Sequence, residues 1–130
     1  MVGLIVVAHA GLARELLAAA EMIVGTIESA EAICVSSGDS VDAIRDSVTR
    51  AIEKVSGSGV IIMADMFGGT PSNMSISFLK ENEVEVITGV NLPMLIKFAT
   101  ERDKSGVAEL ASAIKKCGLE SISVAGDYLK

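Results

Sequence analysis

The sequence predicts an α/β fold: a doubly wound, mainly parallel open sheet with helices on both faces. Short continuous apolar runs, rich in β-branched residues, alternate with longer segments of helical periodicity, as expected for parallel strands that are buried on both faces. Hydrophobic residues make up 50% of the chain and aromatic residues only 3%, so Ile, Val, Leu, Met and Ala must fill the core. The length of 130 residues suits one domain, to which we assign residues 1–130.

The first strand is predicted at residues 4–7, and the only histidine of the chain, His9, follows its carboxyl end. Helical spacing then runs from Leu12 to Gly25, a residue type that readily adopts the left-handed conformation of a helix stop. A side chain at such a strand-to-helix turn lies at the edge where open α/β sheets bind ligands. His9 is therefore the first candidate functional residue.

The second strand is predicted at Ala30–Val35, and the helix after it at Val41–Val55. Residues 36–40 between them end in residue types that cap helices. Apolar side chains in this helix recur every three to four residues, and most charged ones lie outside that stripe. This spacing predicts a helix with one buried face.

The third strand is predicted at Val60–Ala64, another continuous apolar run. It places Asp65 at its carboxyl end. After a glycine-rich turn we expect Thr70 to cap a short helix over residues 71–80, because Pro71 suits the first helical position, where its missing N–H costs nothing.

The fourth strand is predicted at Val84–Thr88, with helices after it over residues 93–101 and 106–117, the last one stopping at Gly118. Residues 121–124 alternate apolar with small polar residues, unlike the other strands. Because such alternation is typical of a strand with one solvated face, we predict a C-terminal edge strand, antiparallel to the others.

Charge and cysteine content exclude several classes of function. The formal net charge of −6, without a basic run, disfavours nucleic acid and anionic membranes as partners. No apolar segment reaches the roughly 18 residues of a membrane span, and the chain does not start like an export signal, so we expect a cytoplasmic protein without direct membrane insertion. Cys34 and Cys117 lie far apart and the chain has one histidine, so neither a disulfide nor a metal site is predicted.

The carboxyl ends of the first, third and fourth strands are expected to form one site, because parallel strands end at the same edge of a sheet. This site would gather His9, residues 65–73 and residues 89–93. If Asp65 accepts a hydrogen bond from Nδ1 of His9, the neutral Nε2 is free to act as a nucleophile.

A glycine-rich turn beside such a nitrogen suits an anionic group. Gly68 and Gly69 allow close approach of the backbone, Thr70 adds a hydroxyl, and free N–H groups at two helix starts favour phosphate. Phosphoryl transfer needs mainly positioning and distributed hydrogen bonds. These residues therefore suggest a phosphohistidine at His9.

Other interpretations of the same residues have less support. His9, Asp65 and Ser72 match a hydrolase triad by residue type, but the G-x-S-x-G turn that exposes such a serine is absent. Neither G-x-G-x-x-G nor a Walker lysine is present, which disfavours a nucleotide site. The glycine-rich turn could also be only a tight connection between strand and helix, with Asp65 as a turn carboxylate.

Three segments, VVAHAGLA, DMFGGTPSN and GVNLPML, resemble the IIA domain of the mannose family of the bacterial phosphoenolpyruvate-dependent sugar phosphotransferase system (PTS). The resemblance covers nearly the whole chain. It implies that His9 is phosphorylated, that Asp65 orients it through Nδ1, and that Thr70 is the hydroxyl residue next to the phosphate. The family usually has glycine directly after the histidine, where this chain has Ala10.

The resemblance also implies partners. His9 would accept a phosphoryl group from the phosphohistidine of the small carrier HPr and pass it to a separate IIB protein for sugar uptake, as a phosphotransferase component without metal or organic cofactor. It further implies a homodimer in which the last strand, here around residues 121–124, is exchanged between subunits. Two alternatives remain open: a phosphoryl donor domain for a dihydroxyacetone kinase, and a regulatory phosphoprotein without onward transfer to sugar.

Overall fold

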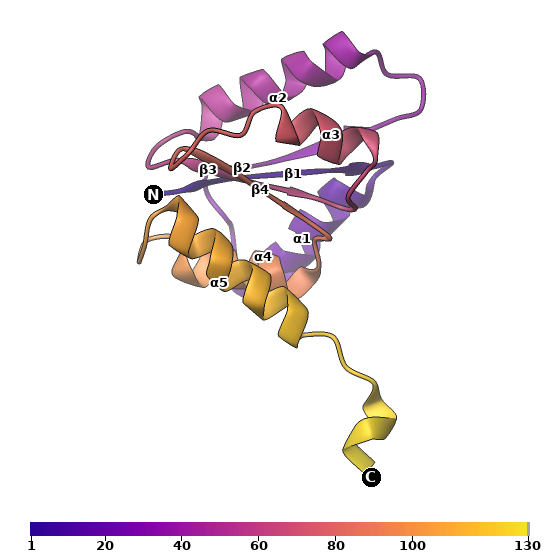
Figure 1. Cartoon of the computed structure of the whole chain (residues 1–130), viewed down its shortest axis with the longest axis vertical. Helices are drawn as coiled ribbons and strands as arrows, with labels where there is room; N and C mark the ends of the chain where they lie inside the picture. Colours follow the sequence, from indigo (N-terminus) through magenta and orange to yellow (C-terminus); the bar gives the residue numbers. More distant parts are fainter. Residues whose placement is uncertain (130) are drawn as a thin grey trace.

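A computed structural model describes residues 1–129, and within them a four-stranded parallel sheet has the order β2-β1-β3-β4 (Figure 1). The strands are β1 (Gly3–His9), β2 (Ala30–Val35), β3 (Val60–Ala64) and β4 (Val84–Thr88). One face of the sheet is covered by α2 (Val41–Val55) and α3 (Thr70–Ile76). The other is covered by α1 (Leu12–Val24), α4 (Leu92–Glu101) and α5 (Val107–Glu120). The predicted α/β fold with helices on both faces is confirmed.

Two apolar clusters, one on each face of the sheet, hold the helices in place. Along β1, Leu4 and Val6 belong to the cluster under α1, α4 and α5, whereas Ile5 and Val7 belong to the cluster under α2 and α3. Successive side chains of a strand point to opposite faces. A strand that contributes to both clusters must therefore be apolar at every position, which explains the continuous runs in the sequence.

The strand order reverses between β1 and β3. The chain goes from β1 to β2 on one side and then returns to β3 on the other side of β1. In the sheet register His9 lies beside Val35 of β2, and Val7 lies beside Ala64 of β3. The carboxyl ends of β1 and β3 are therefore adjacent at the switch point, where open α/β sheets form their ligand crevice.

The helix after β3 differs from the prediction at both ends. Gly69 is its N-cap and Thr70 its first residue, so the expectation that Thr70 caps this helix is wrong. The helix ends at Ile76, not near residue 80, because residues 77–79 continue in tighter turns whose N–H groups bond to carbonyls three residues back.

The last helix, α5, passes through Gly118 and ends at Glu120, so the predicted stop at Gly118 is also wrong. Gly118 is buried, and a Cβ built on it would lie 2.7 Å from Sδ of Met94 in α4. The glycine therefore permits close packing of α5 on α4. Its role is contact between helices and not termination.

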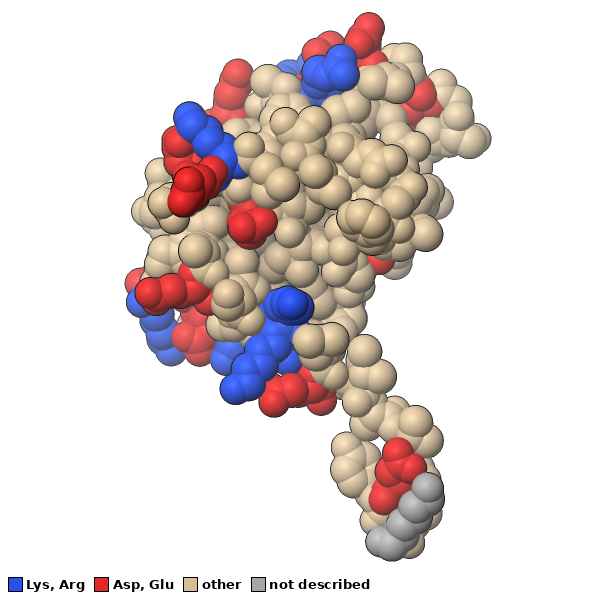
Figure 2. Space-filling model, viewed as in Figure 1, with Lys and Arg blue, Asp and Glu red and all other residues tan. Residues whose placement is uncertain are grey.

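Residues 121–124 form no strand in this single chain. They lead away from the sheet into a short 3-10 helix, Ala125–Leu129, which has no buried residue, and the C-terminal segment stands clear of the body of the molecule (Figures 1 and 2). The expected C-terminal edge strand is thus absent from the sheet within residues 1–129, which contains only β2, β1, β3 and β4. Lys130, the last residue of the predicted domain, lies outside the described residues.

No helix within residues 1–129 combines the length and the apolar character needed to cross a membrane.

Candidate functional site

The carboxylate of Asp65 holds His9 by two contacts. Its Oδ2 lies 2.7 Å from Nδ1 of the imidazole and accepts a hydrogen bond from the backbone N–H of His9 at 3.0 Å. Its other oxygen, Oδ1, accepts from the backbone N–H of Met66 at 3.0 Å. Because both carboxylate oxygens are engaged, the plane of the carboxylate is fixed. The structure thus brings together the pair that the sequence predicted.

These contacts determine which nitrogen of His9 carries hydrogen. Partial burial of Asp65 disfavours its charged form, but the hydrogen bonds from the amide and ring of His9, the charge of that ring and the amide of Met66 outweigh the burial, so the pKa of Asp65 is lowered. The carboxylate is therefore ionised near neutral pH and can only accept hydrogen bonds. Nδ1 must donate, and in the neutral ring the lone pair lies on Nε2.

The free side of the His9 ring faces an open space beside the backbone of Gly69. The side chain of His9 is 51% exposed, whereas that of Asp65 is 12% exposed. A Cβ built on Gly69 would lie 3.0 Å from Cε1 and 3.4 Å from Nε2 of His9. Any side chain at position 69 would therefore intrude on the space that a group bound to Nε2 needs.

Gly68 serves the turn for a different reason. Its φ is +92°, in a region that L residues adopt only at a cost. A Cβ there would have nothing within 4 Å. The two glycines that the sequence singled out are thus both required, one by backbone conformation and the other by contact with His9.

His9 and Thr70 line a shared groove of about 510 Å³. Its other wall comes from the loop after β2, which contributes Ser36, Ser37 and Asp39. Asp39 accepts a hydrogen bond from the N–H of Ser36 at 2.8 Å, which stabilises this loop. Nothing in the local sequence pointed to these residues, because they reach the groove only through the pairing of β2 beside β1, and strand order is not a local property.

Residues 89–93 do not line the groove beside His9, in contrast to the prediction, although the N–H of Val90 donates to the carbonyl of Ala64, next to Asp65, at 3.1 Å. β3 and its loop separate β4 from β1 in the sheet. Asn91 accepts from the N–H of Met94 at 3.2 Å, and its amide donates to the carbonyl of Gly118 at 3.2 Å. Asn91 therefore caps α4 and joins it to α5, and none of residues 89–93 lines the His9 groove.

The turn after His9 contains strain. Ala10 has φ of 51°, a left-handed conformation that costs an L residue about 1–2 kcal/mol. Its N–H donates to the carbonyl of Val35 at 2.8 Å, which ties the turn to the end of β2. The strain falls at the position where the family resemblance leads one to expect glycine.

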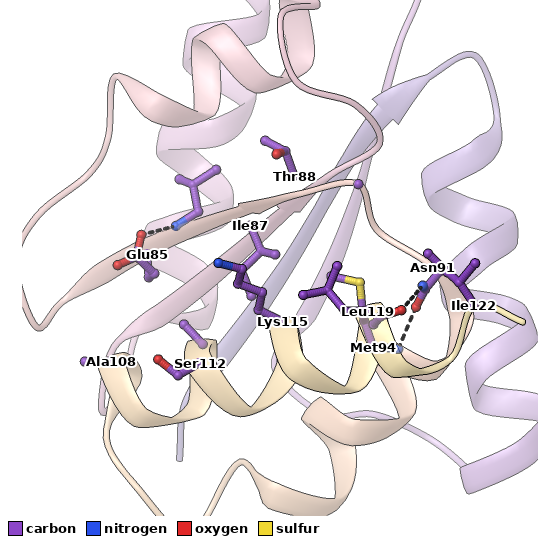
Figure 3. Close-up of a pocket in the computed structure, with 14 residues that line it drawn as sticks. Glu85, Ile87, Thr88, Asn91, Met94, Ala108, Ser112, Lys115, Leu119 and Ile122 are labelled. Carbon is purple, nitrogen blue, oxygen red and sulfur yellow. Dashed lines mark hydrogen bonds between the residues drawn. The ribbon is translucent and has the colours of Figure 1, made fainter.

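A larger groove, of about 620 Å³, runs along the open edge of β4 beside α5 (Figure 3). Its lining is mainly apolar, with Ile87, Leu119 and Ile122 among its residues, and Lys115 extends from α5 toward the strand. The opposite edge of the sheet differs, because Lys54 of α2 pairs with Glu31 of β2 at 2.8 Å. Charged side chains protect an edge strand from further pairing; the β4 edge also has two of them, Glu85 and Lys115, but they lie beside a groove that is mainly apolar.

Comparison with known proteins gives a consistent result. The family model described as "EIIA-man: PTS system fructose IIA component" matches residues 3–115. The chain is 32% identical over 114 residues to the sorbose-specific EIIA component of the PTS of Lacticaseibacillus casei, covering 87% of this chain and 83% of that protein. It is 25% identical over 132 residues to the fructose-specific EIIA component of Bacillus subtilis (strain 168), covering 100% and 90%. The crystal structure of a phosphotransferase system component EIIA from Streptococcus agalactiae superposes with a TM-score of 0.90 at 25% identity, covering 98% of this chain and 99% of that one.

The contact between Gly69 and His9 can be tested by substitution. Gly69→Ala is expected to slow the modification of His9 by diethyl pyrocarbonate severalfold, because the added methyl group crowds Nε2. Its stability should change little, since φ of −90° is accessible to alanine. Gly25→Ala is the matched control, because Gly25 also has positive φ, +85°, and nothing within 4 Å of a built Cβ but lies outside the site: it should lower the free energy of unfolding by about 1–2 kcal/mol and leave the reactivity of His9 unchanged. Equal reactivity of Gly69→Ala and the wild type would contradict the assignment.

The pKa of Asp65 predicts how stability depends on pH. The carboxyl group should titrate below its ordinary value of 3.8. Because the folded-state pKa is lowered, the interaction stabilises the fold above the unfolded-state pKa, and this stabilisation is lost as the pH falls through the folded-state pKa. The difference in stability between the wild type and Asp65→Asn should therefore shrink between about pH 5 and pH 2. Carbon-13 NMR titration together with thermal unfolding measures both quantities, and an Asp65 pKa above 3.8 would refute the prediction.

Proposed function

The chain belongs to the mannose-type IIA (EIIA-man) family of the PTS, and from this premise we propose that it is a histidine phosphocarrier that acts in the cytoplasm. In this proposal His9 accepts a phosphoryl group on Nε2 from the phosphohistidine of HPr and passes it to a IIB component for sugar uptake and phosphorylation. Residues 1–130 act as one IIA domain and as a transferase component. The observation that carries the proposal is the His9 ring held through Nδ1 by Asp65, with Nε2 free beside Gly69.

The transfer step follows from this geometry. The Nε2 lone pair attacks the phosphorus atom of the donor in line with the N–P bond that breaks. The new bond forms at Nε2, and the electron pair of the broken bond stays on the donor nitrogen. The hydrogen on Nδ1 remains in place, and the Asp65 carboxylate at 2.7 Å stabilises the positive charge that develops on the His9 ring. The same steps in reverse deliver the phosphoryl group to the acceptor.

Three residues are proposed to surround the phosphoryl group: Gly68, Gly69 and Thr70. The bare backbone of Gly69 leaves room for it next to Nε2. Thr70 is exposed and lines the same groove as His9, which suits its hydroxyl for a hydrogen bond to a phosphoryl oxygen. Gly68 contributes the turn, since its N–H already donates to the hydroxyl of Ser72.

The surface around His9 suits protein partners. Phe67 and Met66 follow Asp65 directly and are 73% and 54% exposed, and Leu12 at the start of α1 is 45% exposed. On the face shown in Figure 2, the end of the molecule at which the strands terminate carries few charged side chains. Exposed apolar residues of this kind are common at the centres of protein interfaces. We propose that HPr and the IIB component both dock here.

The carrier chemistry is tested by intact mass after incubation with phosphoenolpyruvate, enzyme I and HPr. The expected result is one added phosphate, which brief acid treatment removes and which His9→Ala prevents without loss of the fold. Asp65→Asn should slow labelling about 10²- to 10⁴-fold, because an amide cannot supply two acceptor oxygens and no longer fixes the tautomer of His9.

Three outcomes would argue against parts of the proposal. Normal labelling of His9→Ala would remove His9 as the carrier residue. A normal rate for Asp65→Asn would remove the proposed role of Asp65. Label that reaches the nucleotide-binding subunit of a dihydroxyacetone kinase, or that no IIB protein accepts, would favour one of the alternative partners.

We further propose a homodimer in which residues 121–124 of each copy pair with the β4 edge of the other. This segment projects from its own chain, with Ile122 and Val124 74% and 67% exposed. The β4 edge offers an open, mainly apolar groove (Figure 3). Ile122 lines the groove of its own chain but is still 74% exposed, so exchange between two copies would cover both the groove and the projecting segment.

The dimer is tested by changing the two faces of this segment separately. The double variant Ile122→Asp, Val124→Asp is expected to be monomeric, because both side chains would point into the apolar groove. Ser123→Asp is the control: it adds a charge on the other face of the strand and should leave the dimer intact. Sedimentation equilibrium measures the mass. A monomeric wild type, or a double variant that still dimerises, would refute the proposal.

A further inference from the structure

A buried hydroxyl, that of Ser72, lies directly behind the glycine turn. Ser72 belongs to the first turn of α3 and has 0% exposure. Its Oγ accepts a hydrogen bond from the N–H of Gly68 at 2.9 Å and donates to the carbonyl of Gly69 at 3.1 Å. One side-chain atom therefore binds both glycines of the turn.

The turn needs such a restraint. Gly68 and Gly69 are adjacent glycines, and glycine has the largest conformational freedom of any residue type in the unfolded backbone. The side chains before them, Met66 and Phe67, are exposed and do not anchor the segment in the core. Asp65 holds the start of the turn through the N–H of Met66. The end of the turn is held by the hydroxyl of Ser72 and by the helical bond from Asn73 to the carbonyl of Gly69.

The position of the turn affects His9 directly. The Gly69 backbone lies so close to the imidazole that a Cβ on it would be 3.4 Å from Nε2. A shift of the turn toward the ring would close the space for a phosphoryl group, and a shift away would separate the group from the surrounding backbone. Misplacement of reacting groups by about 1 Å can reduce a rate about 10²-fold.

We propose that Ser72 is a positioning residue for phosphoryl transfer at His9. It holds the Gly68–Gly69 turn at the distance from Nε2 that lets the phosphoryl group enter and leave. Ser72 does not itself contact the phosphoryl group. This inference rests on the proposed phosphocarrier function, and it assigns to Ser72 a role that differs from the hydrolase nucleophile suggested by residue type.

The chain contains a matched control for a purely structural hydroxyl. Ser75 also lies in α3 with 0% exposure, and its Oγ donates to the carbonyl of Pro71 at 2.6 Å. It has no hydrogen bond to the Gly68–Gly69 turn among the described residues. Ser72→Ala and Ser75→Ala therefore remove the same group from the same helix, but only the first releases the turn.

The test measures single-turnover transfer from phosphorylated HPr to His9 by rapid quench, together with urea unfolding. Ser72→Ala is expected to slow transfer about 10- to 100-fold, and Ser75→Ala to stay within about twofold of the wild type. Ser72→Ala removes two hydrogen bonds and Ser75→Ala removes one, so the rates are compared under conditions in which urea unfolding shows both variants fully folded, and stability then cannot account for the difference in rate. Nitrogen-15 relaxation should also show increased motion of the Gly68 and Gly69 amides in Ser72→Ala only.

Failure of this inference is distinguishable from failure of the proposed function. If the wild type transfers normally and both serine variants match it, or slow equally, Ser72 has no positioning role. If the wild type accepts no phosphoryl group, the proposed function is wrong and the inference falls with it. Should Ser72→Ala not fold, Ser72→Cys and Ser75→Cys keep the side-chain volume with a weaker hydrogen-bonding group, and the same difference in rate is expected between them.

Discussion

β1 and β3 pair at the centre of the sheet with their side chains packed on both faces, so the carboxyl ends of the two strands cannot move independently. His9 ends the first strand and Asp65 follows the second. The 2.7 Å contact between Nδ1 and Oδ2 is therefore held by the core and not by the loops. The exposed imidazole of His9 therefore takes a fixed orientation from buried strands, although it is accessible to large partners.

The glycine turn shows how such a site stays open. Gly69 is needed because a side chain would touch the imidazole, whereas Gly68 is needed because the chain turns there with positive φ. Two adjacent glycines make a segment flexible, and the buried hydroxyl of Ser72 binds both of them. The space beside Nε2 thus comes from the two glycines, which have no side chains. The fixed position of the turn comes from the buried side chain of Ser72.

The two edges of the sheet have different surroundings. β2 is flanked by the ion pair between Lys54 and Glu31, and ion pairs of this kind discourage further strand pairing. β4 has an apolar groove beside it, and the apolar C-terminal segment projects from the same chain. None of the residues that line the groove beside β4 lines the His9 groove.

The sequence by itself determined the four parallel strands, the presence of the five helices within residues 1–129 and the central pair of the site, because runs of buried residues and helical spacing are local properties. It also placed His9 and Asp65 at strand ends. Tertiary structure decided which loops meet: Ser37 and Asp39 line the groove, and residues 89–93 do not, because strand order depends on packing between distant segments. Tertiary structure also decided the role of Gly118, because its close approach to Met94 exists only once α4 and α5 have packed. In the sequence, a glycine that ends a helix cannot be distinguished from a glycine that makes room for a neighbouring helix.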